Sequence, residues 1–453
     1  MKKDDILRIK IESIGEDGDG IGLQGKFKIY VPNTMPGDKV KVRIEDCGKT
    51  YAHACLERLI EKSPMRIKPV CEYVLRCGGC QILEMDYNEQ LKLKRHKVEQ
   101  DMKSVKLPET YKMMDTIGCQ NTFRFRNKAI YPISKDSDGN IITGFYTRRS
   151  HNIAQGSDCK IGAVENPLIM DVIIKHLKDN NIEPYDEVSR QGVVRHVMIR
   201  KAFDTGEIMV SIIINAETIT NTENLVKSLL KAVPAIKDIS LNINRNFGNT
   251  IKGNQVKTLY GNGYITDTIG DIKFKISPLS FYQVNPAQTK ILYSKALEYA
   301  NLEGDETVFD LYCGVGTISL FLSQKARKVI GVEVIEQAIN DARENARINN
   351  ISNTEFHVGK AEEVIPDLIE NKGVRADVVV VDPPRKGCDK TLLDTIIKMK
   401  PRRMVYVSCN SETLARDLKY LSENGFFIEK IQPVDMFPNS IHVETVATLN
   451  SKL

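Results

Sequence analysis

The stretch VFDLYCGVGTISL at residues 308–320 decides the fold of the carboxyl-terminal part of this chain. An apolar run of strand length enters a turn that contains Gly314 and Gly316, and a helix-like run follows the turn. Downstream, buried runs such as KVIGVEV (328–334) and ADVVVVDPP (376–384) alternate with helix-like segments. Strands that alternate with helices in this way predict a doubly wound parallel α/β sheet of the Rossmann-like kind.

Two acidic residues stand where a sheet of this kind binds its ligand, at the carboxyl ends of the strands. Glu333 ends the strand after the glycine turn, and Asp382 follows a later buried strand. A carboxylate in the position of Glu333 can accept hydrogen bonds from both ribose hydroxyls of a nucleoside. Position 319 is Ser, so the third glycine of the dinucleotide fingerprint is absent, which tells against NAD or FAD. S-adenosylmethionine, which has no phosphate, fits the pattern; a glycine turn of another α/β domain is the alternative.

Cys409 and Glu444 are the candidate catalytic residues. VYVSCNSETLARD (405–417) places Cys409 between a buried strand and a helix. A thiol near a helix N-terminus has a lowered pKa, so we expect a nucleophile, with a packed structural cysteine as the alternative. Glu444 lies in an apolar run, which indicates a proton-transfer role, or else an edge residue that points to water. Cys388, in RKGC, is a rival thiol near the cofactor strand.

The amino-terminal segment predicts a small, separate domain. Residues 1–60 carry short runs of alternating apolar and polar residues between glycine-containing turns, which predict an OB-like β-barrel. The segment resembles the TRAM domain, an RNA-binding barrel. Lys39, Lys41 and Arg43 occupy alternate positions and give one strand a basic face, for which a solvated outer surface is the alternative.

The rest of the chain divides into two further domains. Residues 61–266 contain a cysteine-rich loop and then strands mixed with short helices, which predict a central α+β domain; residues 267–453 form the α/β domain. The segment 86–106 has a helical pattern, and we expect it to pack on the carboxyl-terminal domain despite its early position. Two extended runs, 426–435 and 441–449, predict an antiparallel hairpin at the sheet edge.

Four cysteines form a candidate metal site. Cys71, Cys77 and Cys80 stand as C-x5-C-G-G-C, and Cys159 follows in SDCKIG. Cysteines this close in a loop of a reduced protein indicate metal binding, and the spacing fits either zinc or an iron–sulfur cluster. We expect the other cysteines to be packing residues, namely Cys47, Cys55, Cys119 and Cys313.

The composition excludes several classes of protein. Of 453 residues, 42% are hydrophobic and 27% are charged, which excludes wholesale disorder, collagen and a coiled-coil rod. No apolar run has the length of a membrane span, and the N-terminus lacks the apolar region of a secretory signal, so we expect a cytoplasmic protein without a membrane partner. The net charge of +5 is compatible with a nucleic-acid partner but does not identify one.

Five motifs together resemble the RNA (uracil-5-)-methyltransferase family. In the order of that family they are FYQVNP (281–286), DLYCGVGT (310–317), DPPRKG (382–387), SCN with TLARD (408–417) and HVETV (442–446). The resemblance implies an S-adenosylmethionine-dependent enzyme. In it, the thiolate of Cys409 adds to carbon 6 of uracil, carbon 5 takes the methyl group, and Glu444 removes the carbon-5 proton.

The resemblance also implies the remaining site residues. Those of the cofactor site are Gln283, Tyr312, Gly314, Gly316, Glu333 and Asp382. Phe281 offers a stacking surface for the flipped uracil, and Arg126, in FRFRNK, lies near the target base. The cysteine pattern is similar to the [4Fe–4S] site of the family's 23S ribosomal RNA branch, Cys71, Cys77, Cys80 and Cys159 being its ligands, in a structural or RNA-positioning role.

The implied substrate is a uridine of 23S ribosomal RNA, and we expect the enzyme to be a monomer. The sequence does not indicate which uridine is modified. A uridine in the T loop of transfer RNA is the alternative substrate. A non-catalytic RNA-binding or ribosome assembly factor is the alternative from another class, against which the intact pair of Cys409 and Glu444 argues.

Overall fold

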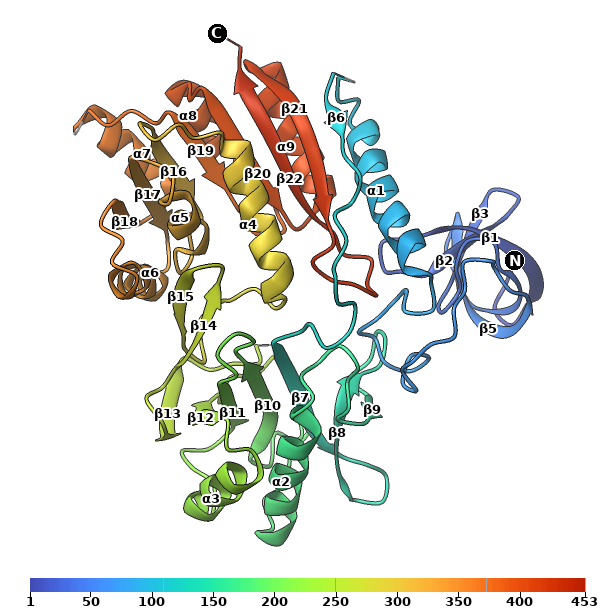
Figure 1. Ribbon diagram of the computed structural model, residues 1–453. Helices are drawn as coiled ribbons and strands as arrows, with labels where there is room; N and C mark the ends of the chain where they lie inside the picture. Colours follow the sequence, from blue (N-terminus) through green and yellow to red (C-terminus); the bar gives the residue numbers. More distant parts are fainter. Residues whose placement is uncertain (109, 249, 372, 453) are drawn as a thin grey trace.

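A barrel, a central sheet and a carboxyl-terminal sheet follow one another along the chain (Figure 1). The computed structural model describes residues 1–108, 110–248, 250–371 and 373–452. The amino-terminal barrel is closed, with the strand order β1-β2-β3-β5-β4. Its strands are β1 (Ile6–Ile14), β2 (Gly20–Gln24), β3 (Phe27–Val31), β4 (Lys39–Cys47) and β5 (Tyr51–Glu61). The predicted barrel is therefore confirmed.

The basic face predicted on β4 is neutralised by carboxylates of its neighbour β5. Lys39 forms an ion pair with Glu61 at 2.8 Å, and Lys41 forms one with Glu57 at 3.0 Å. Arg43 also contacts Glu57, at 3.3 Å. These exposed ion pairs correspond to the solvated-surface alternative, because each cation already has an acidic partner.

The central sheet is covered by helices on one face and by the carboxyl-terminal domain on the other. Its strand order is β13-β12-β11-β10-β7-β8-β9. Met198, Met209 and Ile213 join the core of the carboxyl-terminal domain. The strands are β7 (Lys128–Lys135), β8 (Ile141–Tyr146), β9 (Ile153–Gln155), β10 (Val194–Lys201), β11 (Ile208–Ile214), β12 (Ile236–Ile243) and β13 (Gln255–Tyr260), and the covering helices are α2 (Asn166–Asp179) and α3 (Thr222–Ala232).

The carboxyl-terminal sheet has the order β18-β17-β16-β19-β20-β22-β21-β6. The strands from β18 to β20 are mutually parallel, and β22 is antiparallel to both of its neighbours. The strands are β16 (Thr307–Leu311), β17 (Lys328–Glu333), β18 (Thr354–Val358), β19 (Val378–Val381), β20 (Arg403–Ser408), β21 (Phe426–Val434) and β22 (Glu444–Ser451). The predicted doubly wound α/β sheet is thus confirmed.

Helices cover both faces of this sheet and bury its apolar strands. One face packs on α4 (Pro286–Ala300), α5 (Thr317–Leu322) and α6 (Glu336–Ile348). The other face packs on α7 (Ala361–Glu370), α8 (Lys390–Met399), α9 (Ser411–Glu423) and α1 (Tyr87–Ser104). Figure 1 shows α1 between the barrel and this sheet, beside α9, although α1 comes from the early part of the chain.

Two details differ from the sequence-based expectation. The terminal hairpin is not the edge of the sheet, because β6 (Lys112–Met113) pairs in parallel with β21. The hairpin of β14 (Ile265–Ile269) and β15 (Ile272–Ile276) lies between the central and carboxyl-terminal sheets, so the expected border between residues 266 and 267 falls inside β14 (Figure 1). Within the described ranges, no helix has the length and apolarity to cross a membrane.

Candidate active site

The turn after β16 opens a space at the carboxyl edge of the sheet. Tyr312, Gly314 and Gly316 have positive φ angles of 69°, 53° and 80°, a conformation that favours glycine. A Cβ atom on Gly314 would meet nothing within 4 Å, whereas one on Gly316 would lie 3.1 Å from Ala342. The turn is therefore open at Gly314 and packed at Gly316. It leaves room for a ligand directly above β16.

Glu333 lies at the end of β17, beside this turn. Its carboxylate accepts hydrogen bonds from the backbone amides of Gly314, at 3.3 Å, and Ile335, at 3.0 Å. Further lone pairs remain for a ligand, since a carboxylate offers about four acceptor positions. Val334 and Ile335 are more than half exposed beside it. Acceptor oxygens next to apolar surface suit the sugar and the base of a nucleoside.

Three carboxyl groups lie close together at this edge of the sheet: Asp310 and Glu444 are buried, and Asp382 is half-buried. Burial raises the pKa of Asp310 to about 7 and that of Asp382 to about 7. Burial also raises the pKa of Glu444 to about 8, and the charge of Asp382 adds to this rise. Within the described part of the chain, no Lys or Arg forms an ion pair with any of the three. These raised pKa values mean that the three carboxyl groups are partly protonated near neutral pH, and a bound cation would favour their ionised forms.

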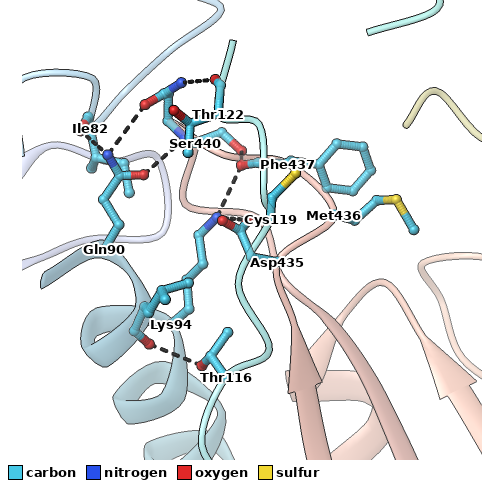
Figure 2. Close-up of polar contacts among 12 residues, drawn as sticks. Ile82, Gln90, Lys94, Thr116, Cys119, Thr122, Asp435, Met436, Phe437 and Ser440 are labelled. Atoms are coloured by element: carbon cyan, nitrogen blue, oxygen red, sulfur yellow. Dashed lines mark hydrogen bonds and ion pairs between the residues drawn. The ribbon is translucent and has the colours of Figure 1, made fainter. Parts of the chain in front are cut away.

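Glu444, the first residue of β22, is only 3% exposed. This burial rules out the alternative of an edge residue pointing to water. The loop before it is fixed by α1, as Figure 2 shows: Lys94 Nζ lies 2.5 Å from Asp435 Oδ1 and donates to the Phe437 carbonyl at 3.0 Å. Gln90 accepts a hydrogen bond from the Asn439 amide at 2.9 Å. α1 therefore positions the segment that leads to Glu444.

Sequence reasoning missed Gln90 and Lys94, although their spacing contains a signal. The buried residues of α1 are Gln90, Lys94, Val98 and Met102, which recur every four positions and so share one face. Two polar residues on the buried face of a helix indicate a buried polar partner. That partner is the loop between β21 and β22.

Cys409 follows β20 and precedes α9, as expected, but its predicted lowered pKa is wrong. Burial raises the pKa of the Cys409 thiol to about 11, and the charges of Glu444 and Asp382 raise it further. Arg385, in the DPPRKG motif, acts in the opposite direction. Desolvation and two carboxylates outweigh the start of a helix. Arg385 had no role assigned from the sequence, yet it is the cation that influences both Cys409 and Glu444.

The segment around Gln283 is held against the central domain. Asn127 donates hydrogen bonds to the carbonyls of Gln283 and Val284, both at 2.8 Å. Phe281 is 68% exposed, so its ring is available for stacking. Arg126, which precedes Asn127, lies next to this segment and donates from Nε to the Lys128 carbonyl at 3.1 Å.

Comparison with known proteins identifies the family. The profile described as tRNA (uracil-5-)-methyltransferase matches residues 86–452, and the profile of the TRAM domain matches residues 4–56. The chain belongs to the tRNA (uracil-5-)-methyltransferase family. The resemblance found in the sequence motifs is thereby confirmed.

Relatives of this methyltransferase align over its whole length. An uncharacterized RNA methyltransferase of Halalkalibacterium halodurans is 44% identical over 100% of this chain and 98% of its own. One of Clostridium acetobutylicum is 46% identical over 99% of this chain and 98% of its own. The crystal structure of Pyrococcus abyssi tRNA (uracil-54, C5)-methyltransferase in complex with S-adenosyl-L-homocysteine matches with a TM-score of 0.79 and 27% identity, covering 98% of this chain and 100% of that one.

The four cysteines of the candidate metal site are neighbours in the folded chain. Among the residues that the structure describes, no three or more His, Cys, Asp or Glu side chains are arranged to hold a metal ion. Burial raises the pKa of Cys80, and the charges of Cys159, Cys77 and Cys71 raise it further. The Gly79 amide donates to Cys77 Sγ at 3.4 Å. The charges of Cys71, Cys77 and Cys159 act on Cys80, so the four thiols are gathered at one place.

The other cysteines of the methyltransferase are weaker candidates for the nucleophile than Cys409. Cys388 is buried in the core formed by α8 and α9, and burial raises its pKa to about 12. Cys119 and Cys313 are buried as well, and Cys47 and Cys55 are half-buried in strands of the barrel. A buried thiol with a raised pKa is a poor nucleophile, so Cys388 is a weaker candidate than the half-buried Cys409.

Proposed function

We propose that this methyltransferase transfers a methyl group from S-adenosylmethionine to carbon 5 of a uridine in 23S ribosomal RNA. The observation that carries the proposal is the pairing of Cys409 and Glu444 at one sheet edge, where the charge of Glu444 raises the pKa of the Cys409 thiol. A nucleophile and a proton acceptor side by side are what methylation of an unreactive ring carbon needs.

The residues at the turn fit the cofactor. S-adenosylmethionine, when bound, supplies an electrophilic methyl group on a positively charged sulfur. Glu333 has free acceptor positions for the ribose, and the open side of Gly314 gives room. Asp382, half-buried and with no ion-pair partner among the described residues, provides negative charge toward the sulfonium. Gln283 and Tyr312 complete the proposed cofactor site.

Cys409 and Glu444 then act on the uracil ring in two different steps. The Cys409 thiol gives its proton to water, and its sulfur forms a bond to carbon 6. The π bond between carbons 5 and 6 breaks, and the resulting enolate makes carbon 5 nucleophilic. After methyl transfer, Glu444 takes the proton from carbon 5 and the bond between Sγ and carbon 6 breaks. The ionised carboxylate of a Glu with a pKa of about 8 is a stronger proton acceptor than that of an ordinary Glu, and it must be ionised before this step. Phe281 stacks on the flipped base, and Arg126 lies beside it.

The test of this function is release of tritium from RNA labelled at carbon 5 of uridine. We expect the purified protein with S-adenosylmethionine to release tritium and to form 5-methyluridine. Methylation at another position would retain the tritium. RNA binding without release would favour the assembly-factor alternative.

A second candidate substrate is a uridine in the T loop of transfer RNA. The specific observation in its favour is the solved relative, which is named a tRNA (uracil-54, C5)-methyltransferase. Mapping 5-methyluridine in ribosomal and transfer RNA from cells that lack this protein separates the two. We expect the loss in 23S ribosomal RNA; a loss confined to transfer RNA would replace our proposal.

We further propose that Cys71, Cys77, Cys80 and Cys159 hold a [4Fe–4S] cluster. Support comes from the closeness of the four thiols, since the charges of Cys71, Cys77 and Cys159 raise the pKa of Cys80, and from the Gly79 amide, which donates to Cys77 Sγ. The cluster would supply structural support, since methyl transfer is redox-neutral. Protein purified without air should contain iron and sulfide and be brown. One equivalent of zinc would favour the zinc site, and metal-free protein of full activity would contradict both.

A further inference from the structure

Three cations surround the segment that carries Phe281. Arg200, on β10, donates to the carbonyls of Ser277 at 3.4 Å and Ser280 at 3.1 Å. Lys252, in the loop before β13, donates to the carbonyls of Pro278 at 3.3 Å and Leu279 at 3.2 Å. Arg200 and Lys252 therefore hold residues 277–280. These residues immediately precede Phe281, whose ring is exposed.

The third cation is Lys128, which lies directly opposite Arg200 on the neighbouring strand β7. Like charges opposite each other across two strands are destabilising. Burial, and then the charges of Arg200 and Lys252, lower the pKa of Lys128 to about 7. Burial lowers the pKa of Arg200 to about 10. The fold therefore holds three mutually repelling cations in a half-buried place.

Within the described ranges, no carboxylate forms an ion pair with Lys128, Arg200 or Lys252. Arg200 is 1% exposed, and its Nε atom has no hydrogen-bond partner among the described residues. Among the described residues, Lys128 Nζ forms neither a hydrogen bond nor an ion pair, in contrast to Lys135 on the same strand, which pairs with Glu183. Buried cations without a protein counter-ion indicate that an anionic ligand completes the site.

We propose that Lys128 binds a backbone phosphate of the RNA next to the base that stacks on Phe281, with Arg200 and Lys252 supporting the segment and adding positive charge. This inference rests on the proposed function. An aromatic ring beside a cationic groove is the usual way in which proteins hold unpaired nucleotides, the ring taking the base and the cations taking the backbone. Arg200 and Lys252 act here as positioning residues.

The test compares Lys128→Gln with Lys135→Gln, a matched control on the same strand. We measure RNA affinity by fluorescence anisotropy at several salt concentrations. For Lys128→Gln we expect about tenfold weaker binding at low salt. We also expect the slope of log affinity against log salt to fall by about 0.7, the value for one phosphate contact on a single strand. Lys135→Gln should change neither quantity, and Lys128→Arg should restore both.

A second readout uses RNA with one neutral methylphosphonate linkage, moved in turn along the positions around the target uridine. One linkage should weaken binding to the wild-type protein and leave Lys128→Gln unaffected, because the two changes remove the same contact. Unchanged slope and affinity in a folded Lys128→Gln protein would overturn the inference. If the wild-type protein releases no tritium, the proposed function fails instead. If Lys128→Arg restores neither the RNA affinity nor the salt slope, Lys128 has a packing role and does not bind a phosphate.

Discussion

The cofactor side and the RNA side of the candidate site are built with opposite charges. At the carboxyl edge of the sheet, burial raises the pKa values of Asp382 and Glu444. On the central domain, burial lowers the pKa values of Lys128 and Arg200. In neither region does an ion pair within the described residues compensate the charge. We propose that each region binds a ligand of opposite charge, a sulfonium on the acidic side and a phosphate on the basic side.

The barrel provides the contrast. Its basic residues on β4 face carboxylates of β5 and are already compensated. A row of cations in a sequence therefore identifies an anion site only when the fold leaves the cations without acidic partners. The basic residues of β4 form an obvious row in the sequence, yet they have acidic partners. Lys128, Arg200 and Lys252 form no such row, and they are the cations without ion pairs among the described residues.

The largest effect is expected where the two sides meet. Cys409→Ala should lower methylation at least about a thousandfold, because no other group can form the bond to carbon 6. Binding of S-adenosylmethionine should remain within about twofold, measured by calorimetry. The Cys388→Ala variant is the matched control and should retain activity. Normal turnover by Cys409→Ala would show that Cys409 is not the nucleophile.

Glu444→Gln should stabilise the protein at alkaline pH. The pKa of Glu444 lies near 8 in the folded state, above its ordinary value of 4.5, so the folded state binds the proton more tightly. The resulting destabilisation begins above pH 4.5 and is complete above pH 8. At pH 9 the variant should unfold with a free energy higher by on the order of 2 kcal/mol, measured with denaturant. An equal change at pH 4 would show that the effect is not due to ionisation.

Asp382→Asn tests the acidic side separately from the basic side, because it removes a carboxylate that we place at the cofactor and no group that we place at the RNA. We expect about tenfold weaker binding of S-adenosylmethionine and a smaller change for S-adenosylhomocysteine, which lacks the positive sulfur. RNA affinity should be unchanged, in contrast to Lys128→Gln. Equal losses for both cofactor forms would mean that Asp382 acts through shape and not through charge.

The smallest effect is expected on the barrel. Lys41→Gln removes a cation that already pairs with Glu57, so RNA affinity should change less than about twofold. The same anisotropy assay measures it. A loss as large as that expected for Lys128→Gln would place the main RNA contact on β4 and not beside Phe281.

The architecture could be predicted because its signals are local. A parallel sheet is predicted by patterns only a few residues long, such as the buried strand Val378–Val381 and the glycine turn at Gly314. In the barrel, the local signal is weaker at β2. β2 contains Gly20 and Gly22, which weaken the strand pattern.

The electrostatics of the site could not be predicted, because they depend on residues distant in the sequence. The pKa of Cys409 is set by carboxylates that other strands bring to it. Lys128, Arg200 and Lys252 come from three separate places and meet only in the folded sheet. The role of Lys94 likewise depends on Asp435, which belongs to the other end of the chain. A local pattern can indicate that a buried polar partner exists, as in α1, but it does not identify that partner.

The central claim is that Cys409 and Glu444 act as nucleophile and base on the same uracil. The most direct measurement is mass spectrometry of Glu444→Gln after incubation with RNA and S-adenosylmethionine. The account predicts a covalent adduct that survives denaturation, attached at Cys409 and carrying a methylated uridine, because the carbon-5 proton is no longer removed. A variant that is merely slow and never forms the adduct, or an adduct attached at Cys388, would contradict it.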